Sequence, residues 1–147
     1  MKGYLVDTNI PSEFTRQQPD ARVMKFIRMA GQGNLFLSVM TLGEIAKGID
    51  LLPLSQKRGD LQNWLDIDVR SWFAGRILLV TEAIAERWGH LAATAKRQGV
   101  ALAVVDGVIA ATALEHDLTL VTRNTRDYTS LGVALINPWL ETTRGRR

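Results

Sequence analysis

The chain has 147 residues and no cysteine, and its 18 lysines and arginines exceed its 15 aspartates and glutamates by a net charge of +3. That length suits one domain with a single core, and the lack of cysteine excludes disulfides, thiolate zinc sites and cysteine nucleophiles. No apolar run approaches the roughly 18–20 residues that cross a bilayer, and no secretory signal precedes the first strand-like run, so we expect a cytoplasmic protein with no membrane contact.

The first apolar run, residues 3–6 (GYLV), predicts a buried strand that ends directly on Asp7. Just after it, Asn9 fits a helix cap and Pro11 fits the first helical turn. Asp7 is therefore either turn chemistry at a strand-to-helix junction or the first ligand of a metal site. The local sequence leaves both interpretations open.

Farther along the chain, short apolar runs alternate with segments of helical spacing. These patterns predict an α/β domain whose parallel sheet has four to five strands and is flanked by helices on both faces. Ligands of such sheets lie just outside the carboxyl ends of the strands. Strands are expected over residues 35–38, 77–80 and 119–122, with a fifth over 133–136, and helices over 20–30, 41–52, 56–73, 81–99 and from 104–106 (VVD) onward.

Three further acidic residues, Glu44, Asp106 and Asp127, come shortly after predicted strands or at the start of a helix. Each also has a local interpretation: Thr41 and Glu44 fit a capping box, Asp106 suits the first turn of a helix, and Asp127 suits a solvated loop. Carboxylates that converge at one sheet edge would repel one another, however, and raise their own pKa values. Hard Mg²⁺ or Mn²⁺ would remove that conflict, so the pattern favours a metal site as much as it favours separate structural roles.

Four motifs, in the order LVDTNIPSE, SVMTLGEIAKGI, VVDGVIAATALEHDLTLVTRNTRDY and INPW, resemble the PIN-domain family over essentially the whole chain. Within that family they resemble the VapC-type, FitB-like toxins of type II toxin–antitoxin systems. The resemblance implies a Mg²⁺-dependent endoribonuclease, with Mn²⁺ as a substitute, in which Asp7, Glu44 and Asp106 are both the catalytic and the metal-binding residues. It also implies a cognate antitoxin, an RNA substrate, a homodimer, and a larger toxin–antitoxin assembly on DNA through the antitoxin.

The fourth acidic position of the family is the one where this chain departs from the pattern. Asn124 stands where many PIN enzymes carry a carboxylate, and Asp127 is the nearby acid. We expect Asn124 to make a neutral or water-mediated contact, with Asp127 secondary. Thr8 would hydrogen-bond an acidic ligand or a phosphate, or else cap a helix. Arg123 and Arg126 would contact the RNA backbone, or else remain solvated loop charges.

The resemblance assigns the PIN domain to residues 1–140 and leaves a basic tail over residues 141–147. Arg144, Arg146 and Arg147 lie in that tail and account for the whole charge excess. The tail fits a solvated chain end, or a contact with RNA or a partner. Net charge alone therefore does not identify a nucleic-acid binder.

Other phosphate-handling folds fit this sequence less well. A haloacid-dehalogenase-like phosphatase needs a second aspartate two residues after the first, where this chain has Asn9. A response-regulator receiver needs an aspartate after its third strand, where ILLVTE has none, and no GxGxxG follows the first strand. The remaining alternative is a non-catalytic PIN-fold module that binds RNA or another partner, and the three intact acids argue against it.

Overall fold

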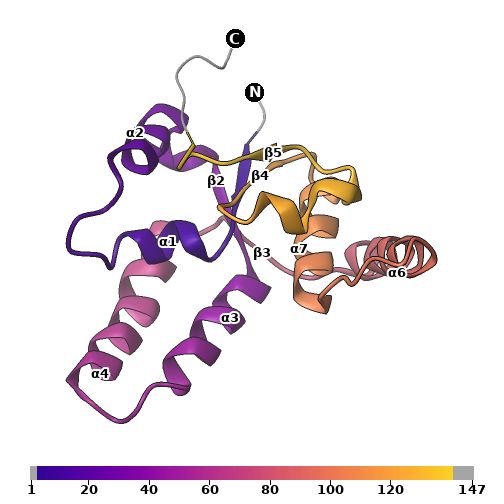
Figure 1. The fold of residues 1–147 in the computed structure, drawn as a ribbon. Coiled ribbons are helices and arrows are strands. Elements are labelled where there is room, and N and C mark those ends of the chain that lie inside the picture. Colours follow the sequence, from indigo (N-terminus) through magenta and orange to yellow (C-terminus); the bar gives the residue numbers. More distant parts are fainter. Residues whose placement is uncertain (1–2, 141–147) are drawn as a thin grey trace.

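The computed structural model describes residues 3–140, and within them the strands form one parallel sheet (Figure 1). The sheet order is β3-β2-β1-β4-β5, and every neighbouring pair is parallel. The order reverses at β1, which pairs with β2 on one side and with β4 on the other. All five predicted strands are thus confirmed: β1 (Tyr4–Val6), β2 (Leu35–Ser38), β3 (Ile77–Leu78), β4 (Thr119–Val121) and β5 (Leu135–Ile136).

Helices connect the strands where the spacing predicted them. The expected helix over residues 56–73 is a continuous helical run in which a π-helical segment, Trp64–Val69, joins α4 to α5. Short 3₁₀ turns cover Gln32–Asn34, Thr125–Asp127 and Thr129–Leu131. The α-helices are α1 (Asn9–Glu13), α2 (Ala21–Ala30), α3 (Val39–Asp50), α4 (Gln56–Asn63), α5 (Arg70–Trp72), α6 (Glu82–Arg97) and α7 (Val104–Glu115).

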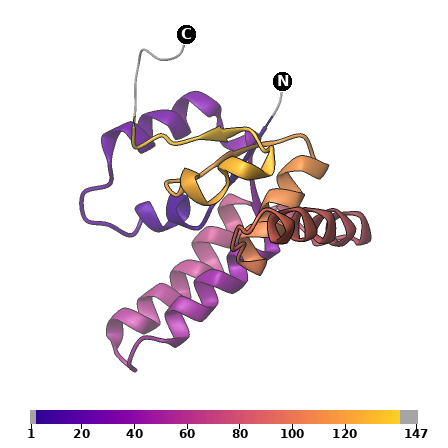
Figure 2. The same ribbon diagram turned by 45° about the vertical axis from the view of Figure 1, so that its right-hand side comes forward.

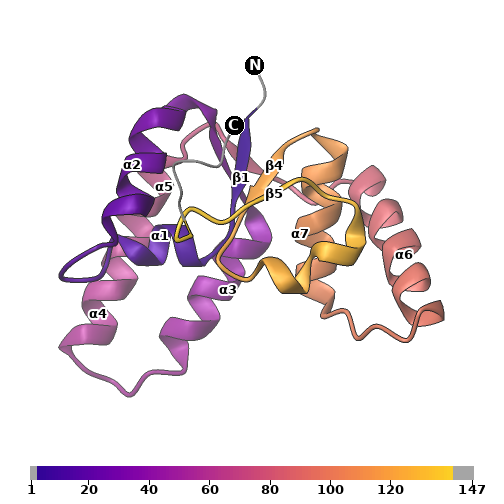
Figure 3. The same cartoon turned by 45° about the horizontal axis from the view of Figure 1, so that its top comes forward.

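Alternate residues of the central strands enter two different cores. Val6 and Val121 belong to the cluster that also contains core residues of α1, α2 and α3. Leu5 and Leu120 belong to a second cluster, with Ile109 of α7. Because successive side chains of a strand point to opposite faces, this division means that both faces of the sheet are covered. Figure 3 shows α1 and α2 on one side of β1 and α7 on the other, with α6 outside α7.

The start of α3 differs from the prediction of a capping box at Thr41. Ser38 is the N-cap, and its Oγ accepts a hydrogen bond of 3.0 Å from the backbone N–H of Met40. Thr41 lies inside the helix and is completely buried. The helix therefore begins directly at the end of β2, and Glu44 lies in its second turn.

The start of α1 also differs from the prediction, because Thr8 and not Asn9 holds the N-cap position, without a side-chain cap.

Helices α3 and α4 project together away from the sheet (Figure 2). No helix within residues 3–140 is long and apolar enough to cross a membrane. The predicted basic tail, 141–147, lies outside the described residues.

Candidate active site

Asp7 is the first residue after β1, and it is held in place from all sides. Its backbone N–H donates to the carbonyl of Val121 at 2.9 Å, which continues the pairing of β1 with β4. In its carboxylate, Oδ1 accepts from the Thr8 N–H at 2.8 Å and Oδ2 accepts from the Thr122 hydroxyl at 2.8 Å. The side chain is 7% exposed. Asp7 is thus a nearly buried carboxylate with a fixed orientation.

Asp106 reaches the same place from the first turn of α7. Its Oδ1 lies 3.2 Å from the hydroxyl of Tyr128, and the same hydroxyl lies 3.4 Å from Oδ2 of Asp7. Tyr128 is 1% exposed. One buried phenol therefore joins two acidic residues from distant parts of the sequence, at the edge of the sheet where its strands end.

The electrostatics of Asp106 reflect this crowding. Burial raises the pKa of Asp106 above its ordinary value, although the hydrogen bond from Tyr128 opposes the rise. The negative charges of neighbouring carboxylates raise the pKa further, in decreasing order Asp127, Asp7 and Glu44. Burial and the charges of the two bridged aspartates also raise the pKa of Tyr128, so its hydroxyl keeps its proton at neutral pH.

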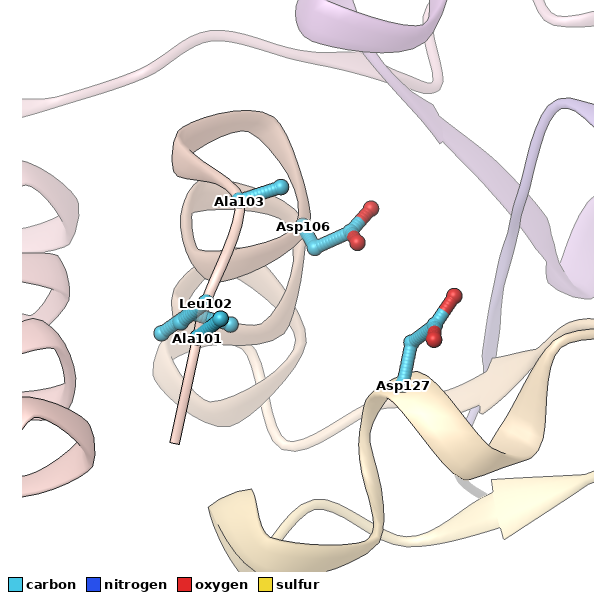
Figure 4. A pocket seen from close by; sticks show the side chains of 5 residues that line it. All are labelled: Ala101, Leu102, Ala103, Asp106 and Asp127. Atoms are coloured by element: carbon cyan, nitrogen blue, oxygen red, sulfur yellow. The ribbon is translucent and has the colours of Figure 1, made fainter. Parts of the chain in front are cut away.

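An open pocket of about 550 Å³ lies beside this pair (Figure 4). Asp106 and Asp127 extend into it from facing segments, and residues 101–103 form its small apolar wall. Asp127 follows β4 by way of a 3₁₀ turn, Thr125–Asp127, in which its N–H donates to the Asn124 carbonyl at 3.0 Å. The pocket therefore has an acidic side chain on each of two facing sides, with room for a ligand between them.

The donor set suits a hard divalent cation, because it consists of carboxylates whose mutual repulsion a cation would relieve. Asp7 and Asp106 share a hydroxyl, and Asp127 faces Asp106 across the pocket. Glu44 is exposed on α3 and acts on Asp106 through its charge. Among the described residues, no three His, Asp or Glu side chains are already close enough to form a complete metal site. A cation would thus complete its coordination with water or substrate oxygens.

Comparison with known proteins decides the family: the PIN-domain model matches residues 4–131. The chain belongs to the PIN-domain family. It is similar to toxin FitB of Neisseria gonorrhoeae, with 38% identity over 135 residues that cover 92% of this chain and 97% of FitB. It is also similar to VapC ribonuclease Y4jK of Sinorhizobium fredii, with 34% identity over 135 residues that cover 92% of this chain and 96% of Y4jK. The solved structure of FitAB bound to an IR36 DNA fragment has a TM-score of 0.86 and 35% identity, and covers 96% of this chain and 99% of that one.

Two of the predicted site residues of this PIN domain, Asn124 of the loop after β4 and Thr8, contribute through their backbone N–H groups. The Asn124 N–H donates to Thr122 Oγ1 at 3.0 Å, so Asn124 supports the hydroxyl that holds Asp7. Thr8 likewise contacts the Asp7 carboxylate through its backbone N–H. Asp127 is the residue of this loop whose carboxylate lines the pocket with Asp106.

The two arginines of the loop differ in their surroundings. The guanidinium of Arg123 lies 5.1 Å from the ring centroid of the buried Trp139, an arrangement that fixes its direction. The Arg123 N–H also donates to Oδ1 of Asn9 at 3.3 Å. Arg126 is exposed at the end of the same loop. Both cations thus lie in the segment that carries Asp127.

Sequence reasoning missed two residues of this PIN domain's site, Thr122 and Tyr128. Thr122 follows β4 as Asp7 follows β1, so the rule that ligands gather after parallel strands would have found it. Tyr128 has a weaker signal: a buried tyrosine hydroxyl needs a hydrogen-bond partner, but only the folded chain reveals which one. Both residues act on Asp7, and neither carries a charge that draws attention in the sequence.

Proposed function

We propose that this PIN domain is a Mg²⁺-dependent endoribonuclease and the toxin of a toxin–antitoxin pair. The observation that carries the proposal is the pair of Asp7 and Asp106, joined by one buried hydroxyl and surrounded by the charges of Asp127 and Glu44. Such a cluster is unfavourable in itself and becomes favourable with a divalent cation. The similarity to a VapC ribonuclease supports cleavage of RNA as the reaction.

Asp7 and Asp106 would hold the Mg²⁺ ion, and Mn²⁺ could replace it. When bound, the ion lowers the pKa of a water molecule and stabilises charge on the phosphate. Glu44 would bind the ion through water or orient the attacking water. Asp127, facing Asp106 across the pocket, is placed to accept a hydrogen bond from a water molecule there. In this arrangement Thr122 keeps the Asp7 carboxylate oriented toward its partner.

The loop after β4 would contact the RNA backbone. Arg123 precedes Asn124, the N-cap of the 3₁₀ turn Thr125–Asp127, and Arg126 lies within that turn beside Asp127. Their contacts with phosphates would add salt-dependent affinity without reading the sequence. The stacking of Arg123 on Trp139 favours a fixed cation at this edge, because a held guanidinium loses less entropy on binding.

The partners follow from the relatives. FitB is a toxin, and FitAB has been solved on a DNA fragment. We therefore infer a cognate antitoxin for this chain, a homodimer of the toxin, and a larger assembly that reaches DNA through the antitoxin. We also infer a cytoplasmic location, because an RNA-cleaving toxin acts where RNA and its antitoxin are made.

The test is RNA cleavage by purified Asp7→Asn and Asp106→Asn variants. Each change nearly preserves shape and removes a negative charge, so folding should survive while the cleavage rate with Mg²⁺ falls about 100-fold or more. Asp68→Asn, at an exposed position on the helical run 56–72, is the matched control and should cleave like the wild type. EDTA should abolish cleavage by the wild type.

Two results would contradict this function. The metal mechanism is wrong if Asp7→Asn or Asp106→Asn cleaves RNA at the wild-type rate with Mg²⁺. A wild type that binds RNA without Mg²⁺-dependent cleavage, with binding that survives Asp106→Asn, would instead support the non-catalytic module. For a wild type that does cleave, sequencing of RNA ends after brief expression of wild type and Asp7→Asn would identify the cleaved RNA.

A further inference from the structure

The hydroxyl of Tyr128 lies between the two acids of the proposed cation site. It is 3.2 Å from Oδ1 of Asp106 and 3.4 Å from Oδ2 of Asp7. A phenol has one proton, so it must share that proton between the two carboxylates or donate to one at a time. Its ordinary pKa of about 10 means that the proton is present at neutral pH. The Tyr128 hydroxyl is therefore a neutral donor between two like charges.

The two carboxylates differ in how else they are held. Asp7 has other donors, from the Thr8 N–H and the Thr122 hydroxyl, so its position does not depend on the tyrosine. The Asp106 carboxylate has no hydrogen-bond partner within residues 3–140 other than Tyr128. Without that bond, repulsion from Asp7 would drive Asp106 outward, toward the open pocket.

Packing fixes the tyrosine itself, independently of the acids. Its ring lies in the core cluster with Leu5, Ile109 and Leu120. Its backbone N–H donates to the Thr125 carbonyl at 2.9 Å, and its carbonyl accepts from the Leu131 N–H at 3.1 Å. A phenylalanine would fill the same apolar space without the cost of burying a hydroxyl. The hydroxyl is thus the atom that packing does not explain.

We propose that Tyr128 is a positioning residue of the carboxylate site: its hydroxyl sets the separation of Asp106 from Asp7 before a divalent cation binds. This inference rests on the cation site proposed above. Holding ligands in their bound arrangement lowers the cost of binding, because less ordering remains to be done when the ion arrives. Outer hydrogen bonds to metal ligands commonly change metal affinity by about 10- to 100-fold.

The experiment compares Tyr128→Phe with Tyr4→Phe by calorimetric titration with Mn²⁺ alone. Tyr4 is the matched control because it is a partly buried tyrosine on β1 whose ring packs edge-on against Phe26, with 5.2 Å between centroids. The dissociation constant for Mn²⁺ should rise about tenfold in Tyr128→Phe and stay at the wild-type value in Tyr4→Phe. Cleavage by Tyr128→Phe should recover toward the wild-type rate at saturating Mn²⁺, as expected of a residue that acts through metal affinity.

The inference is overturned if Tyr128→Phe, shown to be folded by circular dichroism, binds Mn²⁺ like the wild type. It is equally overturned if Tyr4→Phe weakens binding to the same extent, or if the wild type binds no Mn²⁺. The titration needs no RNA. A wild type that binds Mn²⁺ but cuts no RNA would therefore reject the nuclease function and leave the tyrosine's role to be judged on affinity.

A second measurement avoids any change at Tyr128 that could impair folding. The chain has two tyrosines, so wild type labelled with 3-fluorotyrosine gives two fluorine resonances, which Tyr4→Phe assigns. Titration with Mg²⁺ should shift the Tyr128 resonance and leave that of Tyr4 in place. A Tyr128 resonance that ignores Mg²⁺, while calorimetry shows that the ion binds, would overturn the inference.

Discussion

Asp7 and Asp106 are the same residue type in two different surroundings, and their surroundings suggest different tasks. Asp7 follows a central strand and has a donor on each carboxylate oxygen, so it would be a rigid ligand of the proposed cation. Asp106 has one shared donor and faces the pocket, so it can adjust to a bound ion. A helix start favours an anion at Asp106, whereas burial disfavours the charged form and raises its pKa.

The raised pKa predicts how the metal-free protein responds to pH. Folding raises the pKa of Asp106 above its ordinary 3.8. The protonated group therefore stabilises the folded state at a pH below about 3.8, and this contribution is lost as the pH rises through the raised pKa. Asp106→Asn should remove this loss. In EDTA near neutral pH, the melting temperature of Asp106→Asn should lie roughly 2–5 °C above that of the wild type, which corresponds to a gain of about 1 kcal/mol in the free energy of unfolding.

Thermal unfolding followed by circular dichroism at about pH 4.5 and about pH 7.5 checks this expectation, with the exposed Asp68→Asn as control. The difference between Asp106→Asn and the wild type should be larger at the higher pH. Added Mg²⁺ should shrink it by stabilising the wild type. A variant that melts below the wild type at both pH values would contradict the proposed repulsion.

Thr122 gives a second prediction about a single residue of the site. Thr122→Val keeps the shape but removes the donor to Asp7 and leaves the Asn124 N–H without its acceptor. We expect a loss of about 1–3 kcal/mol in the free energy of unfolding, together with weaker Mn²⁺ binding. Urea denaturation and calorimetry measure the two effects.

Thr112→Val is the matched control, because Thr112 is equally buried but its hydroxyl donates to the Val108 carbonyl within α7. That change should leave Mn²⁺ affinity unaltered. If Thr122→Val binds Mn²⁺ as tightly as Thr112→Val does, the Thr122 hydroxyl has no part in orienting Asp7.

Among the elements, the contact of α6 with α7 controls where Asp106 lies. A Cβ at Gly107 would come within 2.8 Å of Cδ1 of Trp88 and 3.0 Å of its Nε1. Either the bulky indole must shift or α6 and α7 must move apart, and the residue before Gly107 is Asp106. Gly107→Ala should therefore lower the free energy of unfolding by about 1–3 kcal/mol and also reduce cleavage.

Gly48→Ala is the control for this prediction, since Gly48 lies within α3 and a Cβ there would meet nothing within 4 Å. It should stabilise the protein by about 0.5–1 kcal/mol, because alanine is the better helix former. Denaturation curves for both variants provide the measurement. Gly107→Ala with wild-type stability would show that the two helices separate at no cost.

The elements themselves were largely predictable from local patterns. Apolar pairs such as Leu5 and Val6 predicted a strand buried on both faces, and those two residues enter opposite cores. The cap of α3 was misjudged because Ser38 and Thr41 are both good caps, and only the end of β2 decides between them. Tyr128 could not be predicted as part of the site, because its two partners lie 121 and 22 residues away in sequence.

The homodimer inferred for this chain predicts self-association of the whole molecule, whose surface also carries several large apolar side chains. Among the described residues these include Met29, Leu51, Leu54, Ile67, Leu79 and Leu140. Because such side chains mark an interface only where they form one contiguous patch, the prediction rests on the inferred homodimer and not on their number. The purified chain should behave as a particle of twice its 16.3 kDa mass in light scattering after size exclusion, and as a larger one with its antitoxin. A mass of 16.3 kDa at every concentration would contradict the homodimer.

The pairing of β1 with β4 also determines when the site can form during translation. The hydroxyl that orients Asp7 comes from a residue 115 positions later, and β4 supplies one neighbour of β1 in the middle of the sheet. A nascent chain on the ribosome therefore carries Asp7 and Glu44 long before the strand and the tyrosine that assemble the centre exist. Fragments released by interrupted translation lack that centre. The nuclease proposed here would therefore be inactive until its synthesis is nearly finished.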